Sequence, residues 1–346
     1  MQNISCIKNP IKASLVTYKN YLNNKIFDPE SRDNITRKFI YLRNKLKEEN
    51  IDLQTCDINL PEESELSIHF DVIKNLLYKK LSPINILIAM ESPIINKYNN
   101  LEKYLNKFDL TITWNKLLCD KKKIIWAGYG NSSDLIETDP VKIFNKKKGD
   151  ICAIISKKYS NKKKALYKER QIAIKFFSNS DLNFDLYGHG WNRRDFQGIL
   201  RPLNKISFAK DFLYKPHPFY KGTVKSKAIT FSKYKFSLCF ENCEAVGYIT
   251  EKVFDSMFSG CIPIYMGCPN IKEEIDPNTF IDLRDFSSYA DLYSYLKNMT
   301  KKEYIYKINK IIEFYDHYLK TTYCDQIWAS NLVNNCLALL KINNKN

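Results

Sequence analysis

The sequence of 346 residues lacks any apolar run of the roughly 18 residues that a membrane-spanning helix requires. Its first residues, MQNISCIKNPIKASLVTYK, also lack the sustained apolar core of a secretory signal peptide, because Pro10 and several lysines interrupt them. Internal repeats and low-complexity tracts are absent as well. We therefore expect a soluble chain that stays in the cytoplasm.

Residue patterns that hold metal ions or disulfides are also missing. Only four histidines occur, none at the spacing of a zinc site, and no DxD triplet lies in a suitable loop. The ten cysteines are scattered, stand mostly among apolar residues and form no CxxC pair. The sequence therefore predicts reduced thiols in the core and no metal site.

Positive charge is in clear excess. The chain has 54 lysines and arginines against 38 acidic residues, a formal net charge of +16 and a pI near 9.2. Such a balance suits nucleic acid, an anionic membrane surface or phosphorylated ligands, and it is also typical of an AT-biased genome. No helix-turn-helix, RNP or zinc-finger pattern supports a nucleic-acid partner. We predict none, and peripheral contact with an anionic membrane stays open.

Helical and strand patterns alternate along the first half, which is typical of an α/β unit with a parallel sheet. A chain of this length suits two domains. The lysine run NKKKG at residues 145–149 breaks the alternating pattern, and we interpret it as the linker between them. We predict a first domain over 1–147, a second over 148–320, and a helix over 321–346 that packs back on the first domain. The predicted first-half elements are strands at 13–18, 51–56, 84–90, 110–114 and 123–127 and helices at 35–46, 70–77 and 101–108.

Residues 233–266, KYKFSLCFENCEAVGYITEKVFDSMFSGCIPIYM, are the most informative segment. The short apolar run 236–240 predicts a buried strand, and apolar spacing over 248–258 predicts a helix that Gly260 ends. A second apolar strand follows. In such strand–helix–strand units, ligands lie outside the carboxyl ends of the strands, where the helix presents free N–H groups.

The first turn of this predicted helix has an unusual charge. Thr250 suits the helix cap and Glu251 suits the positive end of the helix dipole, whereas Lys252 has the wrong sign unless an anion is also present. A bound phosphate would explain Lys252, and the alternative is a solvated lysine that points outward. Glu241 precedes this loop, and we interpret it as a loop-holding residue outside the site.

Two further charged residues follow predicted strands. Glu91 comes directly after the apolar run ILIAM, which places a carboxylate at the carboxyl end of a central strand, facing the expected cleft. Arg170 lies in the helical pattern 162–177 after the strand DICAIIS. The alternative interpretations are a solvated acid at a strand end and a surface cation on a basic helix.

Three stretches, FSLCFEN, YITEK and SGCIPIYMG, closely resemble the donor-binding signature of the α1,3-fucosyltransferase family, particularly its bacterial members. The match covers only about a tenth of the chain, but it is dense and ordered. The resemblance implies a GT-B glycosyltransferase: two Rossmann-like α/β domains whose parallel sheets face a cleft. It further implies GDP-fucose as donor, inversion of the anomeric centre, and no cofactor or metal. Lacking the membrane anchor and CxxC pair of animal members, the chain is similar to the cytosolic branch.

The resemblance also implies residue roles. Glu91, in AMESP, matches the family's general base, although Met90 stands where the family commonly has glycine or a small polar residue. Chemistry requires cations that stabilise a departing diphosphate when no metal does so. The implied donor-binding residues are Arg170 and Lys252 as those cations, Asn242 and Tyr248 near the diphosphate, and Glu251 on the ribose hydroxyls.

The sequence thus predicts transfer of L-fucose from GDP-β-L-fucose to an acceptor glycan by direct displacement, forming an α1,3 linkage to O3 of N-acetylglucosamine or glucose. The expected acceptor is an oligosaccharide or glycolipid of lipopolysaccharide biosynthesis or protein glycosylation. Two alternatives are a GT-B transferase with another sugar nucleotide and a basic nucleic-acid-binding protein. The loop 202–220 carries no chemistry that we can assign, and we expect it to shape the acceptor cleft.

Overall fold

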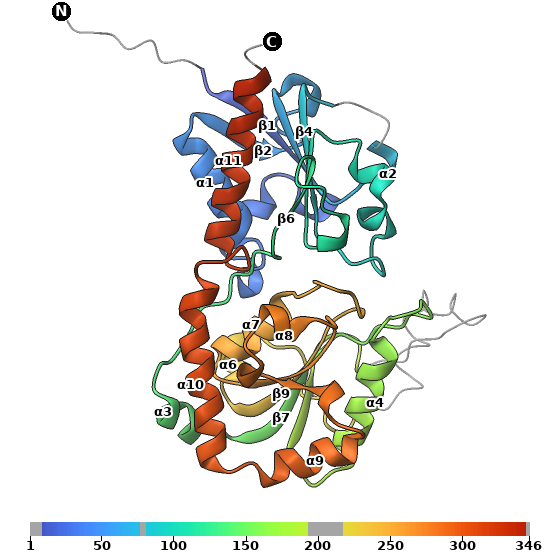
Figure 1. Cartoon of the computed structure of the whole chain (residues 1–346), viewed down its shortest axis with the longest axis vertical. Helices are drawn as coiled ribbons and strands as arrows, with labels where there is room; N and C mark the ends of the chain where they lie inside the picture. The colour runs from blue at the N-terminus through green and yellow to red at the C-terminus, as the bar shows by residue number, and fades with distance from the viewer. Residues whose placement is uncertain (1–8, 77–80, 193–216, 344–346) are drawn as a thin grey trace, which may run out of the picture. The chain divides into compact units, whose positions relative to one another are not determined.

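The computed structural model describes residues 9–76, 81–192 and 217–343, and the chain divides into two compact units (Figure 1). One unit contains residues 1–132 and 318–346, and the other contains residues 133–317. Most of the loop predicted at 202–220 lies outside the described residues. No helix within the described ranges is long and apolar enough to cross a bilayer.

The first unit is built on a six-stranded parallel sheet in the order β2-β1-β3-β4-β5-β6. Every residue of the central strand β4 is buried, as expected for a parallel strand covered on both faces. The strands are β1 (Ile11–Val16), β2 (Ile51–Thr55), β3 (Leu66–Phe70), β4 (Ile84–Ala89), β5 (Leu110–Thr113) and β6 (Ile124–Trp126).

The helix predicted at 70–77 is wrong for the residues that the structure describes. Phe70 ends strand β3, and Lys74–Leu76 form a short 3-10 turn. Strand β3 lies between β1 and β4, and its polar residues Ser67 and His69 are buried there together with its apolar residues Leu66 and Ile68. Buried polar residues therefore hid this strand from an argument based on apolar runs.

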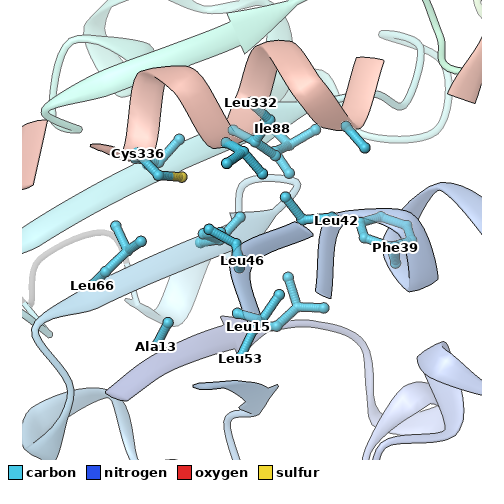
Figure 2. Close-up of a cluster of buried hydrophobic side chains, with 14 of the residues drawn as sticks. Ala13, Leu15, Phe39, Leu42, Leu46, Leu53, Leu66, Ile88, Leu332 and Cys336 are labelled. Atoms are coloured by element: carbon cyan, nitrogen blue, oxygen red, sulfur yellow. The ribbon is translucent and has the colours of Figure 1, made fainter. Parts of the chain in front are cut away.

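Helix α11 (Asp325–Asn343) belongs to the core of the first unit, where it packs against α1 (Arg37–Glu48). Figure 2 shows Leu332 and Cys336 of α11 in one cluster with Leu46 of α1 and Ile88 of β4. A second, smaller cluster around the short helix α2 (Glu102–Leu105) contains Leu87 and Ala89 of β4. The two ends of the chain thus build one hydrophobic core.

The second unit contains a five-stranded parallel sheet in the order β11-β10-β9-β7-β8. Its strands are β7 (Gly149–Ile154), β8 (Phe184–Tyr187), β9 (Tyr234–Phe240), β10 (Ile262–Met266) and β11 (Ile281–Asp282). The helices among its described residues are α3 (Pro140–Asn145), α4 (Tyr167–Ser178), α6 (Lys227–Phe231), α7 (Glu251–Phe258), α8 (Ile271–Glu274), α9 (Tyr289–Asn298) and α10 (Lys301–Tyr318).

The division between the units falls at residues 132 and 133, earlier than the lysine run at 145–149 that the sequence suggested as linker. The segment before that run packs with the second unit. The N–H of Ile136 donates to the carbonyl of Phe258 (3.0 Å), and Ile143 of α3 lies so close to Gly260 that a Cβ there would come within 2.8 Å of it. These contacts join residues far apart in the sequence, so a composition change could not reveal them.

Candidate functional site

The candidate site lies where β9 ends, in the loop that leads to α7, with α4 beside it. Strand β9 and its neighbour β10 are parallel, and α7 connects them, so the loop occupies the carboxyl edge of the sheet. The apolar face of α7 is buried, and the hydroxyl of Ser256 on α7 bonds that of Ser237 on β9 at 2.6 Å. Packing on the sheet therefore fixes the direction of the helix.

Glu241, the residue directly after β9, is completely buried. Its carboxylate accepts hydrogen bonds from the N–H of Thr250 (2.9 Å), the hydroxyl of Thr250 (2.8 Å) and Nζ of Lys252 (3.1 Å). Gly267 lies behind it, where an added Cβ would come within 2.5 Å of Cγ of Glu241. This carboxylate therefore ties together the strand end and the beginning of α7.

Thr250 stands at the N-cap position, but its side chain does not cap the helix in the predicted way. An N-cap hydroxyl normally accepts a bond from an N–H in the first turn, and that of Thr250 makes no such bond. It donates to Glu241 and accepts from Nζ of Lys252 (2.8 Å) instead. The hydroxyl thus links the acid to the lysine.

Lys252 is not the outward-pointing, solvated lysine of the alternative interpretation. Its side chain is 26% exposed and contacts Glu241, Thr250 and Glu251, whose Oε1 lies 3.5 Å from Nζ. Burial favours the neutral amine, but the charges of Glu241 and Glu251 outweigh burial and raise the pKa of Lys252 above its ordinary value. The chain itself therefore supplies a buried anion, Glu241, that offsets the positive charge of Lys252 in this first turn.

Arg170 is also no surface cation. It is 6% exposed on α4, and its Nη2 donates to the carbonyl of Phe240 (2.6 Å) and to Oδ1 of Asn242 (3.1 Å). Its guanidinium carbon lies 5.0 Å from the ring centre of Tyr167. Burial lowers the pKa of Arg170, although the group stays charged. Its Nε is buried and finds no hydrogen-bond partner in the described part of the chain.

The structure brings the five predicted donor-binding residues into one cluster. Asn242 bonds Arg170, and Lys252 contacts Glu251. Tyr248 is buried, and the side chain of Glu251 is one-third exposed. Both lie close enough to Arg170 to oppose the lowering of its pKa by burial. Arg170, Asn242, Tyr248, Glu251 and Lys252 therefore share one end of the second sheet.

The charges of this cluster nearly cancel. Arg170 and Lys252 contribute two positive charges, and Glu241 and Glu251 contribute two negative ones. An anion would therefore be held by specific donors rather than by net charge. Three kinds are present: Nε of Arg170, the partly exposed ammonium group of Lys252, and the N–H groups in the first turn of α7, which has no earlier helical turn to bond them.

Sequence reasoning missed Glu241 as the organiser of this site. The signal that could have found it is Lys252, since a lysine in the first turn of a helix requires a nearby negative charge. A phosphate was the inferred partner, although an acid nine residues before the N-cap residue Thr250 could fill the same need. The position of Glu241 next to Lys252 becomes visible only when the loop is folded.

Glu91 belongs to the first unit and lies outside this cluster. It follows β4 closely and is half-buried. Its N–H donates to Oδ1 of Asp71 (3.1 Å), and its carbonyl accepts from Nδ2 of Asn99 (3.3 Å). The structure thus places this carboxylate at the carboxyl end of a central strand, as predicted.

Two further features concern metals and thiols. In the part of the chain that the structure covers, no three His, Cys, Asp or Glu side chains are gathered in a way that could hold a metal ion. All nine described cysteines are free thiols, most of them buried. Their burial agrees with the expectation of reduced core cysteines.

Two parallel-sheet α/β units are the architecture of the GT-B fold, which solved glycosyltransferase structures also have. A model of glycosyltransferase family 10 (fucosyltransferase), C-terminal part, matches residues 144–345. Because this match covers more than half of the chain, the chain belongs to that family.

Relatives share shorter segments. The α-(1,3)-fucosyltransferase FucT of Helicobacter pylori is 43% identical over 74 residues, which are 21% of this chain and 16% of that enzyme. An α-(1,4)-fucosyltransferase of Arabidopsis thaliana is 40% identical over 68 residues, which are 20% of this chain and 17% of that protein. The matched segments thus span less than a fifth of either relative.

Solved structures share the fold at low identity. An α1,3-fucosyltransferase with GDP is 19% identical and matches with a TM-score of 0.52 over 94% of this chain and 95% of the other. Anabaena HepE in complex with UDP and glucose is 10% identical and matches with a TM-score of 0.56 over 95% and 99%. These matches confirm the predicted GT-B fold.

Glu241→Gln tests the role of the buried carboxylate. The change keeps the side-chain shape but leaves Lys252 without its buried counter-charge, so we expect the free energy of unfolding to fall by about 2 to 4 kcal/mol. Urea denaturation followed by circular dichroism measures this. Glu244→Gln, a half-buried glutamate in the same loop, is the matched control, and equal stability of the two variants would contradict the assignment.

Proposed function

We propose that the chain is an inverting fucosyltransferase that moves L-fucose from GDP-β-L-fucose to a hydroxyl of an acceptor glycan. The observation that carries the proposal is the buried Nε of Arg170, for which the described residues offer no acceptor. A buried charged donor without a partner costs free energy, and a diphosphate oxygen is an acceptor suited to a guanidinium. Membership of family 10 supports fucose as the sugar.

The diphosphate would contact three kinds of donor. Arg170 supplies Nε, the first turn of α7 supplies backbone N–H groups, and Lys252 supplies a partly exposed ammonium group. Asn242 holds the guanidinium in place through its Oδ1, and Tyr248 lies in the same cluster. These donors stabilise the negative charge that develops on the leaving GDP, which is the role that a divalent cation has in other transferases. We therefore propose catalysis without a metal.

Glu251 would recognise the ribose of the donor. Its carboxylate is one-third exposed and stands beside Lys252, which keeps it close to the diphosphate position. A carboxylate can accept hydrogen bonds from two vicinal hydroxyls, so it favours a ribose over groups that lack this pair.

Glu91 would act as the general base. It removes the proton from the attacking acceptor hydroxyl while that oxygen attacks the anomeric carbon from the side opposite GDP. Attack from that side inverts the centre, so a β-linked donor gives an α-fucoside. We propose O3 of N-acetylglucosamine or glucose as the attacking group, carried on an oligosaccharide or glycolipid.

A cytoplasmic enzyme that acts on a lipid-carried glycan would work at the inner face of a membrane. The net charge of +16 would favour peripheral contact with anionic lipid headgroups there. We propose that the reaction takes place in the cytoplasm, and the net positive charge supports contact with the membrane surface there.

Another sugar nucleotide is the second candidate donor, because the fold does not determine the sugar. HepE, whose structure contains UDP and glucose, matches this chain with a TM-score as high as that of the α1,3-fucosyltransferase with GDP. The donor therefore requires a direct test.

Donor and acceptor are tested together by incubation with GDP-fucose, GDP-mannose or UDP-glucose and a panel of short glycans, followed by mass and linkage analysis. We expect transfer from GDP-fucose, an α linkage in the product, and the same rate with EDTA as without it. Faster transfer from UDP-glucose would favour the second candidate. Loss of activity in EDTA that added Mg²⁺ restores would contradict the metal-free mechanism.

Lys252→Ala tests the cation near the diphosphate. Removing a charged donor should weaken GDP binding about 10- to 100-fold, as measured by titration calorimetry, and slow turnover as well. Lys302→Ala, an exposed lysine on α10, is the control and should bind GDP like the unchanged protein. Unchanged GDP affinity in Lys252→Ala would contradict the phosphate role.

Glu91→Gln tests the base. The amide cannot take up the hydroxyl proton, so we expect kcat to fall by about 10²- to 10⁴-fold while GDP affinity stays the same. Glu102→Gln on α2, an exposed acid in the same unit, is the matched control. An equal loss of turnover and of GDP affinity would argue against the base assignment.

A further inference from the structure

A buried carboxylate, Asp71, lies beside Glu91 in the first unit. Asp71 follows β3, whose neighbour in the sheet is β4, and its N–H donates to the carbonyl of Ile88 (2.9 Å). The side chain is completely buried, and the backbone is left-handed, with φ of 65°. Left-handed backbone is uncommon for residues other than glycine, and aspartate and asparagine tolerate it best.

Both oxygens of Asp71 accept hydrogen bonds. Oδ1 accepts from the N–H of Met90 (2.8 Å), the N–H of Glu91 (3.1 Å) and Nδ2 of Asn99 (2.6 Å). Oδ2 accepts from the hydroxyl of Tyr18 (2.8 Å). One carboxylate thus satisfies two successive peptide N–H groups at the turn that carries Glu91.

Asn99 completes the attachment of this turn. Its Nδ2 also donates to the carbonyl of Glu91 (3.3 Å), and its Oδ1 accepts from the N–H of Val72 (2.8 Å). The N–H and the carbonyl of Glu91 are therefore both bound to buried side chains, Asp71 and Asn99. These two side chains thus bind the backbone of Glu91 just beyond the end of β4.

Tyr18 connects the same carboxylate to the region around Glu91. Its ring packs edge-on against Phe70, with ring centres 5.8 Å apart. Burial and then the charge of Asp71 raise the pKa of Tyr18, and the charge of Glu91 adds to this. The phenol therefore stays a hydrogen-bond donor, and it lies within electrostatic reach of the Glu91 carboxylate.

Stability alone does not explain a buried charge at this place, because apolar replacements of buried ionic groups are often neutral or stabilising. Burial raises the pKa of Asp71, and its donors, the N–H of Glu91 and the phenol of Tyr18 among them, oppose that shift. A carboxylate with several donors holds a turn more firmly than a neutral acceptor does, since charge-assisted bonds are about twice as strong.

We propose that Asp71 is a positioning residue for the Glu91 carboxylate, and that Tyr18 and Asn99 complete the hydrogen-bond network through which it acts. The proposal rests on the proposed role of Glu91 as general base. Removing the network would leave Glu91 present but displaced from the acceptor hydroxyl, and displacement by about 1 Å can cost 100-fold in rate.

Two variants test the proposal. Asp71→Asn keeps the side-chain shape and a residue type that tolerates left-handed backbone, and it removes the charge and replaces one acceptor oxygen by an amide NH2. Tyr18→Phe keeps the ring packed on Phe70 and removes only the hydroxyl. We expect kcat to fall about 10- to 100-fold in Asp71→Asn and about 3- to 10-fold in Tyr18→Phe, with GDP affinity and donor KM within twofold of the unchanged protein.

Combination with Glu91→Gln separates positioning from general destabilisation. A residue that acts through Glu91 has no further effect once Glu91 is lost, so the residual rate of Asp71→Asn/Glu91→Gln should equal that of Glu91→Gln within about twofold. If the two losses multiply instead, Asp71 has a structural role and the proposal is overturned. Tyr18→Phe/Glu91→Gln gives the same test should Asp71→Asn fold poorly.

A matched tyrosine serves as the control. Tyr295 also donates its hydroxyl to a carboxylate, that of Glu303 at 2.7 Å, and both residues belong to the second unit. Tyr295→Phe should keep full kcat, and thermal unfolding of each variant gives the folded fraction by which rates are corrected. Full kcat in Asp71→Asn together with an inactive Glu91→Gln overturns the positioning role and leaves the base role intact. An active Glu91→Gln overturns both.

Discussion

The cluster of charged and polar residues at the end of β9 depends on the buried carboxylate of Glu241. It accepts bonds from the backbone and side chain of Thr250 and from Lys252, so the end of β9 and the start of α7 have a single fixed arrangement. Without this charge, Lys252 would face the positive end of the helix dipole with only the partly exposed Glu251 to oppose it. Arg170 also lies within the electrostatic reach of Glu241. Glu241 therefore binds one of the two proposed phosphate-binding cations, Lys252, directly and influences the other, Arg170, through its charge.

The first unit uses a similar device. Asp71 is buried at the end of β3 and accepts the N–H groups of Met90 and Glu91, as Glu241 at the end of β9 accepts the N–H of Thr250. Peptide N–H groups in a loop over a sheet edge have no strand partner, and a buried carboxylate satisfies them with strong bonds. Each unit thus contains a buried acid that shapes a loop, Asp71 or Glu241, beside a partly exposed charged residue, Glu91 or Lys252.

These arrangements also give the cluster its chemical character. Because Glu241 and Glu251 balance Arg170 and Lys252, the site does not attract anions by net charge alone. It offers instead a small set of oriented donors in a partly buried place, where hydrogen bonds are stronger than in water. Oriented donors of this kind stabilise charge that develops during a reaction without having to rearrange.

The sequence by itself determined the family signature, the buried strands and the residue types of the site. The runs at 84–90 and 236–240 are apolar and short, and helical spacing over 248–258 is local, so each can be read from neighbouring residues. FSLCFEN and YITEK contain four of the five residues predicted to bind the donor, Arg170 follows the strand DICAIIS, and the structure brings all five together. The same local reasoning missed β3, whose Ser67 and His69 are polar but buried.

Only the tertiary structure decided which charges are partners. Glu241 meets Lys252, Arg170 is buried rather than solvated, and Asp71 bonds the backbone of Glu91. Residues 133–147 likewise belong to the second unit because of contacts with distant segments. The physical reason is that burial periodicity is a local property of a chain, whereas the partner of a buried charge depends on which strand ends become neighbours in the folded sheet.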